Sequence, residues 1–304
     1  MVELRGLVCA LTTPFRDDQS LDLDAYRRLV DVVIDDGIEA IVIAGCTGEP
    51  WALSDEERWA MFETAVDQAK NRVPVVAGCG AMVSANCIAH ARRAQDAGCD
   101  AIMVHPPFYA MPSLTELYDF YKQILAASEL PMMIYNIPSR TGIHMTADLV
   151  DSLADEPRVI ALKESSKDWL VLSEMIRRAK DRINVLVGYA DTLGLAGMTE
   201  GAVGVVEALL PPLIGPAYRR FVDAGVAGDR ETAVPLQAEF ARRQAELRIG
   251  SFPAPLKAAL NMMGRPGGRP RDPIQPLDAT RTERVREVLL SMGLVAAEPA
   301  RRAS

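Results

Sequence analysis

The sequence predicts an α/β protein, a (β/α)8 TIM barrel with a C-terminal helical extension. Short apolar runs alternate with longer amphipathic segments over about 220 residues, and they do so eight times. A doubly wound sheet is the alternative, but it rarely needs eight such even repeats. No G-x-G-x-x-G or G-x-x-x-x-G-K-[ST] motif follows a strand candidate, so a nucleotide-binding fold would lack its phosphate loop.

The strand candidates are apolar runs typical of strands that are buried on both faces. Amphipathic segments with helical periodicity lie between them, for example residues 23–37, 54–70 and 85–98. Several of these segments open with Ser or Asp and close with Gly, as capped helices do, and Ser54 with Glu57 forms a capping box. The eight strand candidates cover residues 6–13, 40–45, 73–79, 101–107, 131–136, 159–164, 183–188 and 202–207.

The strand pattern stops after about residue 224. The Pro- and Gly-rich stretch GRPGGRPRDPIQP interrupts the helical patterns that follow. Those patterns cover residues 229–248, 254–264 and 281–293. We therefore expect a catalytic barrel at residues 1–223, a helical extension at 224–297 and a disordered tail at 298–304.

Composition and charge exclude several classes of function. The net charge is −8 and the pI about 5.1, whereas nucleic-acid binding calls for a basic surface. No stretch approaches the roughly 18 apolar residues of a membrane span, and the N-terminus lacks the features of a signal peptide. The 5 cysteines and 3 histidines are scattered, without the spacing of a zinc or other metal site. We expect a cytoplasmic protein with reduced thiols and no nucleic-acid or membrane partner.

Polar residues gather where four strand candidates end, which in a barrel is the mouth of the active site. The segments are GCTGE, HPPFYAMP, YNIPSRTG and LKES. Together they offer an amine, two phenols, a hydroxyl, a thiol, an arginine and glycine-rich turns, but no carboxylate pair and no metal-ligand set. This combination favours chemistry on a carbonyl group through an imine.

Lys163 ends the apolar run at residues 159–162. An ordinary lysine has a pKa of about 10.4 and is protonated at neutral pH. Desolvation lowers that pKa, and the free amine can then attack a ketone to form a Schiff base. A tyrosine hydroxyl nearby can move protons, and the backbone N–H groups of a Gly-Cys-Thr-Gly turn can hold a substrate carboxylate.

Each of these residues also has a purely structural interpretation. Lys163 can snorkel to the surface from a strand end, and Tyr135 and Tyr109 can be amphipathic core aromatics. Arg140 can simply stabilise its loop. The GCTGE turn can be a plain helix start, with Glu49 a carboxylate that orders the loop and takes no part in acid–base chemistry.

Taken together, the motifs resemble those of the dihydrodipicolinate synthase and N-acetylneuraminate lyase family of Schiff-base lyases. GCTGE matches the family's G-[ST]-T-G-E, and PPFY, YNIPSRTG and LKES follow in family order and spacing, within about residues 4–293. The resemblance implies a (β/α)8 barrel with C-terminal helices, a homotetramer built as a dimer of dimers, and no metal or organic cofactor. It also implies that Lys163 forms the imine.

The resemblance implies roles for further residues. Tyr135 falls at the phenol that shuttles protons beside the imine, and Tyr109 at a tyrosine that family members lend to the neighbouring subunit's site. Thr47, with the amides around it, falls where the keto acid carboxylate is held. Arg140 falls where synthases bind the carboxylate of aspartate semialdehyde. The other substrate-binding positions that the resemblance implies are Cys46, Gly48, Gly188 and Val206.

Several positions depart from the synthase pattern. Cys46 replaces a hydroxyl that relays protons between two tyrosines, and a thiol is a weaker hydrogen-bond partner. Phe108 and Ala110 stand where synthases often have Tyr and Asn. Glu207 lies in a turn that is often Ser there.

These motifs predict a Schiff-base-forming lyase that acts on pyruvate or a related 2-keto acid. The first expectation is 4-hydroxy-tetrahydrodipicolinate synthesis from pyruvate and aspartate 4-semialdehyde. An aldolase, dehydratase or deaminase for a 2-keto-3-deoxy sugar acid is the alternative, which Cys46 and Ala110 favour. A metal-dependent barrel isomerase is disfavoured by the lack of His and carboxylate clusters. A non-catalytic ligand-binding paralogue is disfavoured by the intact set of Lys163, Tyr135 and Thr47.

The resemblance extends to a regulatory site, at which many synthases bind lysine at the interface of two subunits. The glutamate that would pair with the ammonium group of the ligand is an amide here, and two polar partners are apolar. Burying the charges of an amino acid without partners costs several kcal/mol, so we expect the activity to be insensitive to lysine. By spacing, the corresponding positions are Pro50, Trp51, Met82, Asn86 and Phe108.

Overall fold

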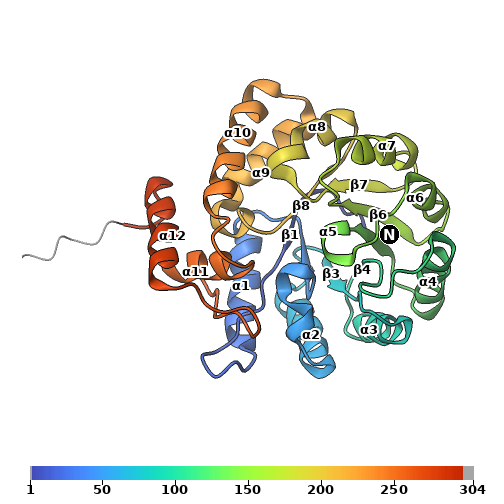
Figure 1. Cartoon of the computed structure of the whole chain (residues 1–304), viewed down its shortest axis with the longest axis horizontal. Coiled ribbons are helices and arrows are strands. Elements are labelled where there is room, and N and C mark those ends of the chain that lie inside the picture. The colour runs from blue at the N-terminus through green and yellow to red at the C-terminus, as the bar shows by residue number, and fades with distance from the viewer. Residues whose placement is uncertain (1, 297–304) are drawn as a thin grey trace, which may run out of the picture.

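The computed structural model describes residues 2–296, so the predicted tail at 298–304 lies outside the described residues. Eight parallel strands, β1 to β8, form one closed barrel in sequential order (Figure 1). β1 pairs with both β2 and β8, which closes the sheet. At least one helix follows each strand and packs on the outside of the barrel. The predicted (β/α)8 barrel is confirmed.

All eight strand candidates form strands, and most of these are shorter than the apolar runs that predicted them. The longest strand is β6, with 6 residues, and it ends in Lys163 and Glu164. The strands are Gly6–Ala10 (β1), Ala40–Ile43 (β2), Val75–Gly78 (β3), Ala101–Val104 (β4), Met132–Asn136 (β5), Val159–Glu164 (β6), Asn184–Val187 (β7) and Gly204–Glu207 (β8).

Several barrel helices begin at a Ser, Thr or Asp cap, as the sequence indicated, but most of them end at a residue other than Gly. The capping box before the second helix is present, because Glu57 N donates to Ser54 Oγ and Ser54 N donates to Glu57 Oε2. Two short 3-10 helices, Cys46–Gly48 (η1) and Pro50–Ala52 (η2), precede it. The barrel helices are Leu23–Asp35 (α1), Asp55–Ala69 (α2), Ser84–Asp96 (α3), Leu114–Ala127 (α4), Pro138–Thr141 (α5), Ala147–Ala154 (α6), Trp169–Ala179 (α7), Ala190–Glu200 (α8) and Pro211–Ala227 (α9).

Two apolar layers hold the barrel together. Along β1, Val8 and Ala10 belong to a cluster inside the barrel, while Leu7 and Cys9 pack in the layer between the strands and the helices. Both faces of each strand are therefore buried. This explains why the strand candidates are continuous apolar runs and do not alternate with polar residues.

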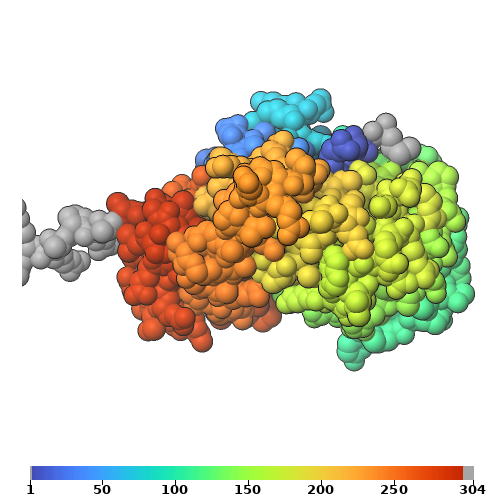
Figure 2. Space-filling view, turned by 90° about the horizontal axis from the view of Figure 1, so that it is seen from above, coloured from blue at the N-terminus to red at the C-terminus, as the bar shows by residue number. Residues whose placement is uncertain are grey.

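The C-terminal extension contains the three predicted helices, Arg230–Glu246 (α10), Ala254–Met262 (α11) and Ala279–Ser291 (α12). α10 packs against α8 and α9, and α11 and α12, in orange and red, form one end of the molecule (Figure 2). α9 runs across residue 223, so the division of the chain at that position stays a prediction. Among the described residues, no helix is long and apolar enough to cross a membrane.

Candidate active site

Lys163 lies near the C-terminal end of β6, on the interior face of the barrel. It lies two residues after Ala161, a member of the interior cluster, so the two side chains share the interior face of the strand. The residue is 6% exposed, and burial lowers the pKa of its amine to about 8, because desolvation disfavours the charged form. At pH 7 about a tenth of this lysine is therefore the free amine, far more than for a lysine of ordinary pKa, which makes it a usable nucleophile.

Tyr135 in β5 is the register partner of Lys163 in β6. Lys163 Nζ lies 4.2 Å from the centroid of the Tyr135 ring. Burial raises the pKa of the Tyr135 phenol well above its ordinary value, so the phenol stays protonated at neutral pH. A protonated phenol beside an amine can donate a proton to a reaction intermediate and accept one later.

The Gly-Cys-Thr-Gly turn follows β2 and contains η1. Gly48 N donates to Gly45 O at 2.8 Å, and Thr13 Oγ1 donates to Gly48 O at 2.7 Å. These bonds fix the turn beside the end of β1. Cys46 and Thr47 line the same cavity as Lys163. A tight turn that presents amides and a hydroxyl is suited to bind a carboxylate.

The cavity has a volume of about 260 Å³ and collects most of the predicted site residues. Gly48 is buried in its turn but does not line the cavity, and Tyr109 is 88% exposed on the loop after β4. The predicted contribution of Tyr109 to a neighbouring subunit's site therefore stays a prediction. The predicted residues that line the cavity are Cys46, Thr47, Tyr135, Arg140, Lys163, Gly188 and Val206.

Gly188 shapes the wall of this cavity beside Lys163. A side chain at this position would overlap Ser165 Oγ and stand 2.9 Å from Glu164 O. Gly188 N donates to Glu164 O at 2.7 Å, which brings the end of β7 close to the end of β6. Only glycine allows this approach.

A second cavity, of about 420 Å³, adjoins the first and shares Cys46, Tyr135, Ile137 and Arg140 with it. The positions that the sequence indicated for a lysine site lie together along its wall. They are Pro50, Trp51, Met82, Asn86 and Phe108.

Comparison with known proteins decides the family. The profile of the Dihydrodipicolinate synthetase family matches residues 3–292, nearly the whole chain. The chain belongs to the dihydrodipicolinate synthetase family. It is therefore an enzyme of the Schiff-base lyase class.

Family members of known activity and structure are similar over almost the full length. A 4-hydroxy-tetrahydrodipicolinate synthase from Parabacteroides distasonis is 34% identical over 298 residues, 96% of this chain and 98% of the relative. Dihydrodipicolinate synthase from Acinetobacter baumannii, solved in complex with pyruvate, superposes with a TM-score of 0.90 at 30% identity, over 96% of this chain and 99% of the other. The dihydrodipicolinate synthase from Cyanidioschyzon merolae, solved with lysine bound, superposes with a TM-score of 0.91 at 28% identity, over 97% of this chain and 100% of the other.

Two buried polar residues of this family member were missed by sequence reasoning. Asn136 Nδ2 donates to Glu164 Oε1 at 2.9 Å, and Ser166 N donates to the same oxygen at 2.7 Å. Asn136 and Glu164 directly follow Tyr135 and Lys163 and are register partners themselves. Their hydrogen bond holds together the two strand ends that carry the amine and the phenol. The sequence feature that could have revealed them is that each is a polar residue at the end of an apolar strand candidate.

Glu207 was noted in the sequence as a departure but not as a site residue. It ends β8, is 6% exposed and lines the 260 Å³ cavity with Lys163. Its Oε1 accepts a hydrogen bond from Ala208 N at 2.8 Å, whereas Oε2 is buried without a hydrogen-bond partner among the described residues. Burial raises the pKa of the carboxyl group to about 7. Such a group can act as either acid or base near neutral pH.

Apart from Glu207, the charged residues that line the cavity are all cationic, which favours an acidic substrate. Arg140, Lys167 and Arg248 line it in addition to Lys163. Within residues 2–296, no group of three or more His, Cys, Asp or Glu side chains is arranged to hold a metal ion.

Proposed function

We propose that the enzyme forms a Schiff base between Lys163 and the ketone carbon of pyruvate or a related 2-keto acid. The observation that carries this proposal is the buried amine of Lys163, 4.2 Å from the ring centroid of Tyr135, in a cavity that Thr47 also lines. The pyruvate complex of the Acinetobacter baumannii relative supports the choice of keto acid.

In this mechanism the free amine of Lys163 attacks C2 of the keto acid, while the carboxylate of the substrate rests on the Thr47 hydroxyl and the amides of its turn. Tyr135 protonates the departing oxygen, water leaves, and a protonated imine forms. The iminium withdraws electrons from C3, so a C3 proton passes to the Tyr135 phenolate and an enamine forms. The enamine carbon is then a nucleophile toward a second substrate.

The first candidate activity is 4-hydroxy-tetrahydrodipicolinate synthase. The enamine would attack the aldehyde carbon of aspartate 4-semialdehyde and form a C–C bond. The amine of that substrate would then displace Lys163 from the imine carbon, closing the ring and freeing the lysine. Arg140, an exposed cation that lines the cavity, would bind the carboxylate of the acceptor. The named activity of the Parabacteroides distasonis relative supports this candidate.

A dehydratase or aldolase for a 2-keto-3-deoxy sugar acid is the second candidate, and Glu207 favours it. In a dehydratase, the enamine expels a hydroxyl group, whose oxygen needs a proton as its bond breaks. Glu207, buried in the same cavity as Lys163 with a pKa of about 7, can supply that proton. A synthase does not expel a hydroxyl of this kind in its C–C bond-forming step.

Two assays separate the candidates. Borohydride reduction with a panel of 2-keto acids, followed by mass measurement, tests the imine and ranks the donors. Turnover of pyruvate with aspartate 4-semialdehyde would support the synthase, and turnover of a 2-keto-3-deoxy sugar acid alone would support the second candidate. No adduct on Lys163 with any keto acid would overturn both.

We also propose that the chain assembles into a homotetramer. The loop after β4 supports this, because it exposes several large apolar side chains that a neighbouring subunit could cover. Sedimentation of the purified enzyme tests the proposal, and a fully active monomer would contradict it. The exposed fractions in this loop are 37% for Phe108, 88% for Tyr109 and 58% for Met111.

A further inference from the structure

A buried ion pair links the C-terminal extension to the Gly-Cys-Thr-Gly turn. Lys257 of α11 is 1% exposed and pairs with Glu49, which is fully buried and directly follows the turn. Lys257 Nζ also donates to Thr13 O and to Arg269 O, each at 2.7 Å. A buried ammonium group that makes an ion pair and two hydrogen bonds holds its neighbours in one fixed arrangement.

Glu49 needs this support because of its backbone conformation. Its φ of 55° and ψ of 50° lie in the left-handed region, which residues with a side chain rarely adopt. Glu49 ends η1 and begins the approach to η2, so its conformation sets the direction of the chain after Gly48. Lys257 contacts Glu49 Oε1, and Arg271 N donates to Oε2 at 3.0 Å. Both oxygens of the carboxylate are therefore held by the C-terminal extension.

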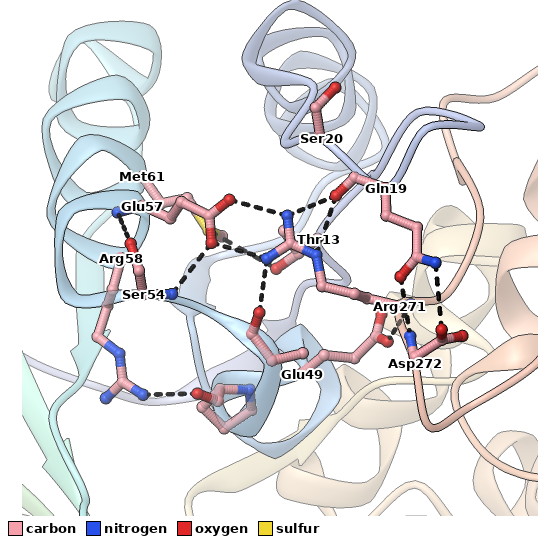
Figure 3. A network of polar contacts seen from close by, with 12 residues as sticks. Thr13, Gln19, Ser20, Glu49, Ser54, Glu57, Arg58, Met61, Arg271 and Asp272 are labelled. Carbon is pink, nitrogen blue, oxygen red and sulfur yellow. Dashed lines mark hydrogen bonds and ion pairs between the residues drawn. The ribbon is translucent and has the colours of Figure 1, made fainter.

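Arg271 anchors the other end of the same loop (Figure 3). Its guanidinium group donates to both carboxylate oxygens of Glu57, at 2.7 and 2.8 Å, and to Ala52 O at 2.5 Å. It also donates to Gln19 O and lies over the Phe15 ring, 4.0 Å from its centroid. The bidentate bond fixes the first turn of α2, and the bond to Ala52 fixes η2.

Lys257 and Arg271 act on the cavity indirectly, through the residues that hold the turn. Neither residue lines the cavity of Lys163, and neither does Glu49. The loop that they hold carries Cys46 and Thr47, which do line it. Thr13, whose carbonyl accepts a hydrogen bond from Lys257, also anchors the turn through its hydroxyl, which donates to Gly48 O.

We propose that Lys257 and Arg271 are positioning residues that hold the Gly-Cys-Thr-Gly turn in the geometry that binds the carboxylate of the keto acid. This inference rests on the proposed function. It makes the C-terminal extension a part of the substrate-binding machinery. Loss of either contact should weaken recognition of the carboxylate while Lys163 keeps its reactivity toward a ketone.

The test compares variants Arg271→Gln and Lys257→Met with the control Arg269→Gln. Arg269 lies on the same segment, but its guanidinium group donates to Asp17 O and Pro270 O and contacts neither Glu49 nor the turn. The double variant Glu49→Gln with Lys257→Met removes both charges of the pair together, so that no uncompensated charge stays buried. Thermal melting confirms that each variant is folded.

Borohydride trapping on Lys163 is measured with increasing pyruvate and, separately, with acetone, a ketone without a carboxylate. We expect Arg271→Gln and Lys257→Met to raise the half-saturating pyruvate concentration by roughly 10-fold or more, as for the loss of hydrogen bonds to a charged group. In these two variants, trapping by acetone should change less than about 2-fold, because acetone has no carboxylate for the turn to bind. Arg269→Gln should leave the trapping of pyruvate and of acetone within about 2-fold of the wild type, because its side chain does not hold the turn.

Two results would overturn the inference. One is an unchanged half-saturating pyruvate concentration in folded Arg271→Gln. If Lys257→Met does not fold, Arg271→Gln alone decides the test. The other is a parallel loss of pyruvate and acetone trapping, which would indicate general disruption of the site. A wild-type enzyme that pyruvate does not label would instead refute the proposed function, and this inference with it.

Discussion

Tyr135 and Lys163 are register partners in β5 and β6, and the lysine amine lies over the phenol ring, 4.2 Å from its centroid. Burial lowers the pKa of the amine to about 8 and raises that of the phenol, so it favours the neutral form of each. A neutral nucleophile beside a neutral acid is the combination that imine formation requires.

Replacing Tyr135 by Phe should lower kcat on the order of 10²-fold or more, as expected for the loss of a general acid–base group. The ring remains, so the packing around Lys163 should be kept and the melting temperature should change little. Steady-state kinetics together with thermal melting check both parts. An unchanged rate would reduce Tyr135 to a core aromatic.

Replacing Arg140 by Ala should mainly weaken binding of the acceptor substrate. A hydrogen bond to a charged group contributes about 1.5–3 kcal/mol, so the KM for the acceptor should rise roughly 10- to 100-fold. The KM for the keto acid should stay nearly constant, and Arg140→Lys, which keeps the charge, should recover part of the loss. A rise in KM for the keto acid alone, with the KM for the acceptor unchanged, would contradict the synthase proposal.

Replacing Glu207 by Gln should change the pH dependence of stability. The pKa of this carboxyl group is 4.5 ordinarily and about 7 in the folded enzyme. Between these values the folded protein holds a proton that the unfolded chain has lost, so stability falls as pH rises from about 4.5 to about 7. Glutamine does not titrate, so the stability of the variant does not fall with pH for this reason.

Glu207→Gln should therefore be more stable than the wild type at pH 8, by on the order of 2 kcal/mol, and this advantage should shrink toward pH 5. Denaturant unfolding at the two pH values measures the difference. The same difference at both values would show that Glu207 does not titrate in this range.

Lysine at millimolar concentration should leave the activity unchanged. The five positions expected for a regulatory site do lie along one cavity, but Asn86 offers an amide where an ammonium group needs a carboxylate. Steady-state assays with added lysine check this. Half-maximal inhibition below about 1 mM, which corresponds to about 4 kcal/mol of binding, would show that the site is misplaced.

The barrel could be predicted from the sequence because a parallel barrel buries both faces of each strand. The resulting apolar runs are visible without any knowledge of long-range contacts. Lys163 and Tyr135 stood out for the same reason, since each places a polar group near the end of such a run. The hydrogen bond between Asn136 and Glu164 was missed because it depends on the register of two neighbouring strands.

The contacts of the C-terminal extension could not be predicted, because they join distant parts of the chain. Arg271 bonds to Glu57 from 214 positions away. The sequence indicated that Glu49 orders its loop, but it held no sign that Lys257 would be the partner. Such pairs depend on how the extension packs against the barrel, which local patterns do not encode.

The central claim is that Lys163 forms an imine with a 2-keto acid, and one measurement tests it most directly. The enzyme is incubated with pyruvate, reduced with borohydride, digested and analysed by mass spectrometry. The account predicts a covalent adduct on Lys163 and none on Lys167 or Lys257, with no adduct at all in Lys163→Ala. An intact, unmodified Lys163 after reduction with pyruvate and with the other 2-keto acids would contradict the account.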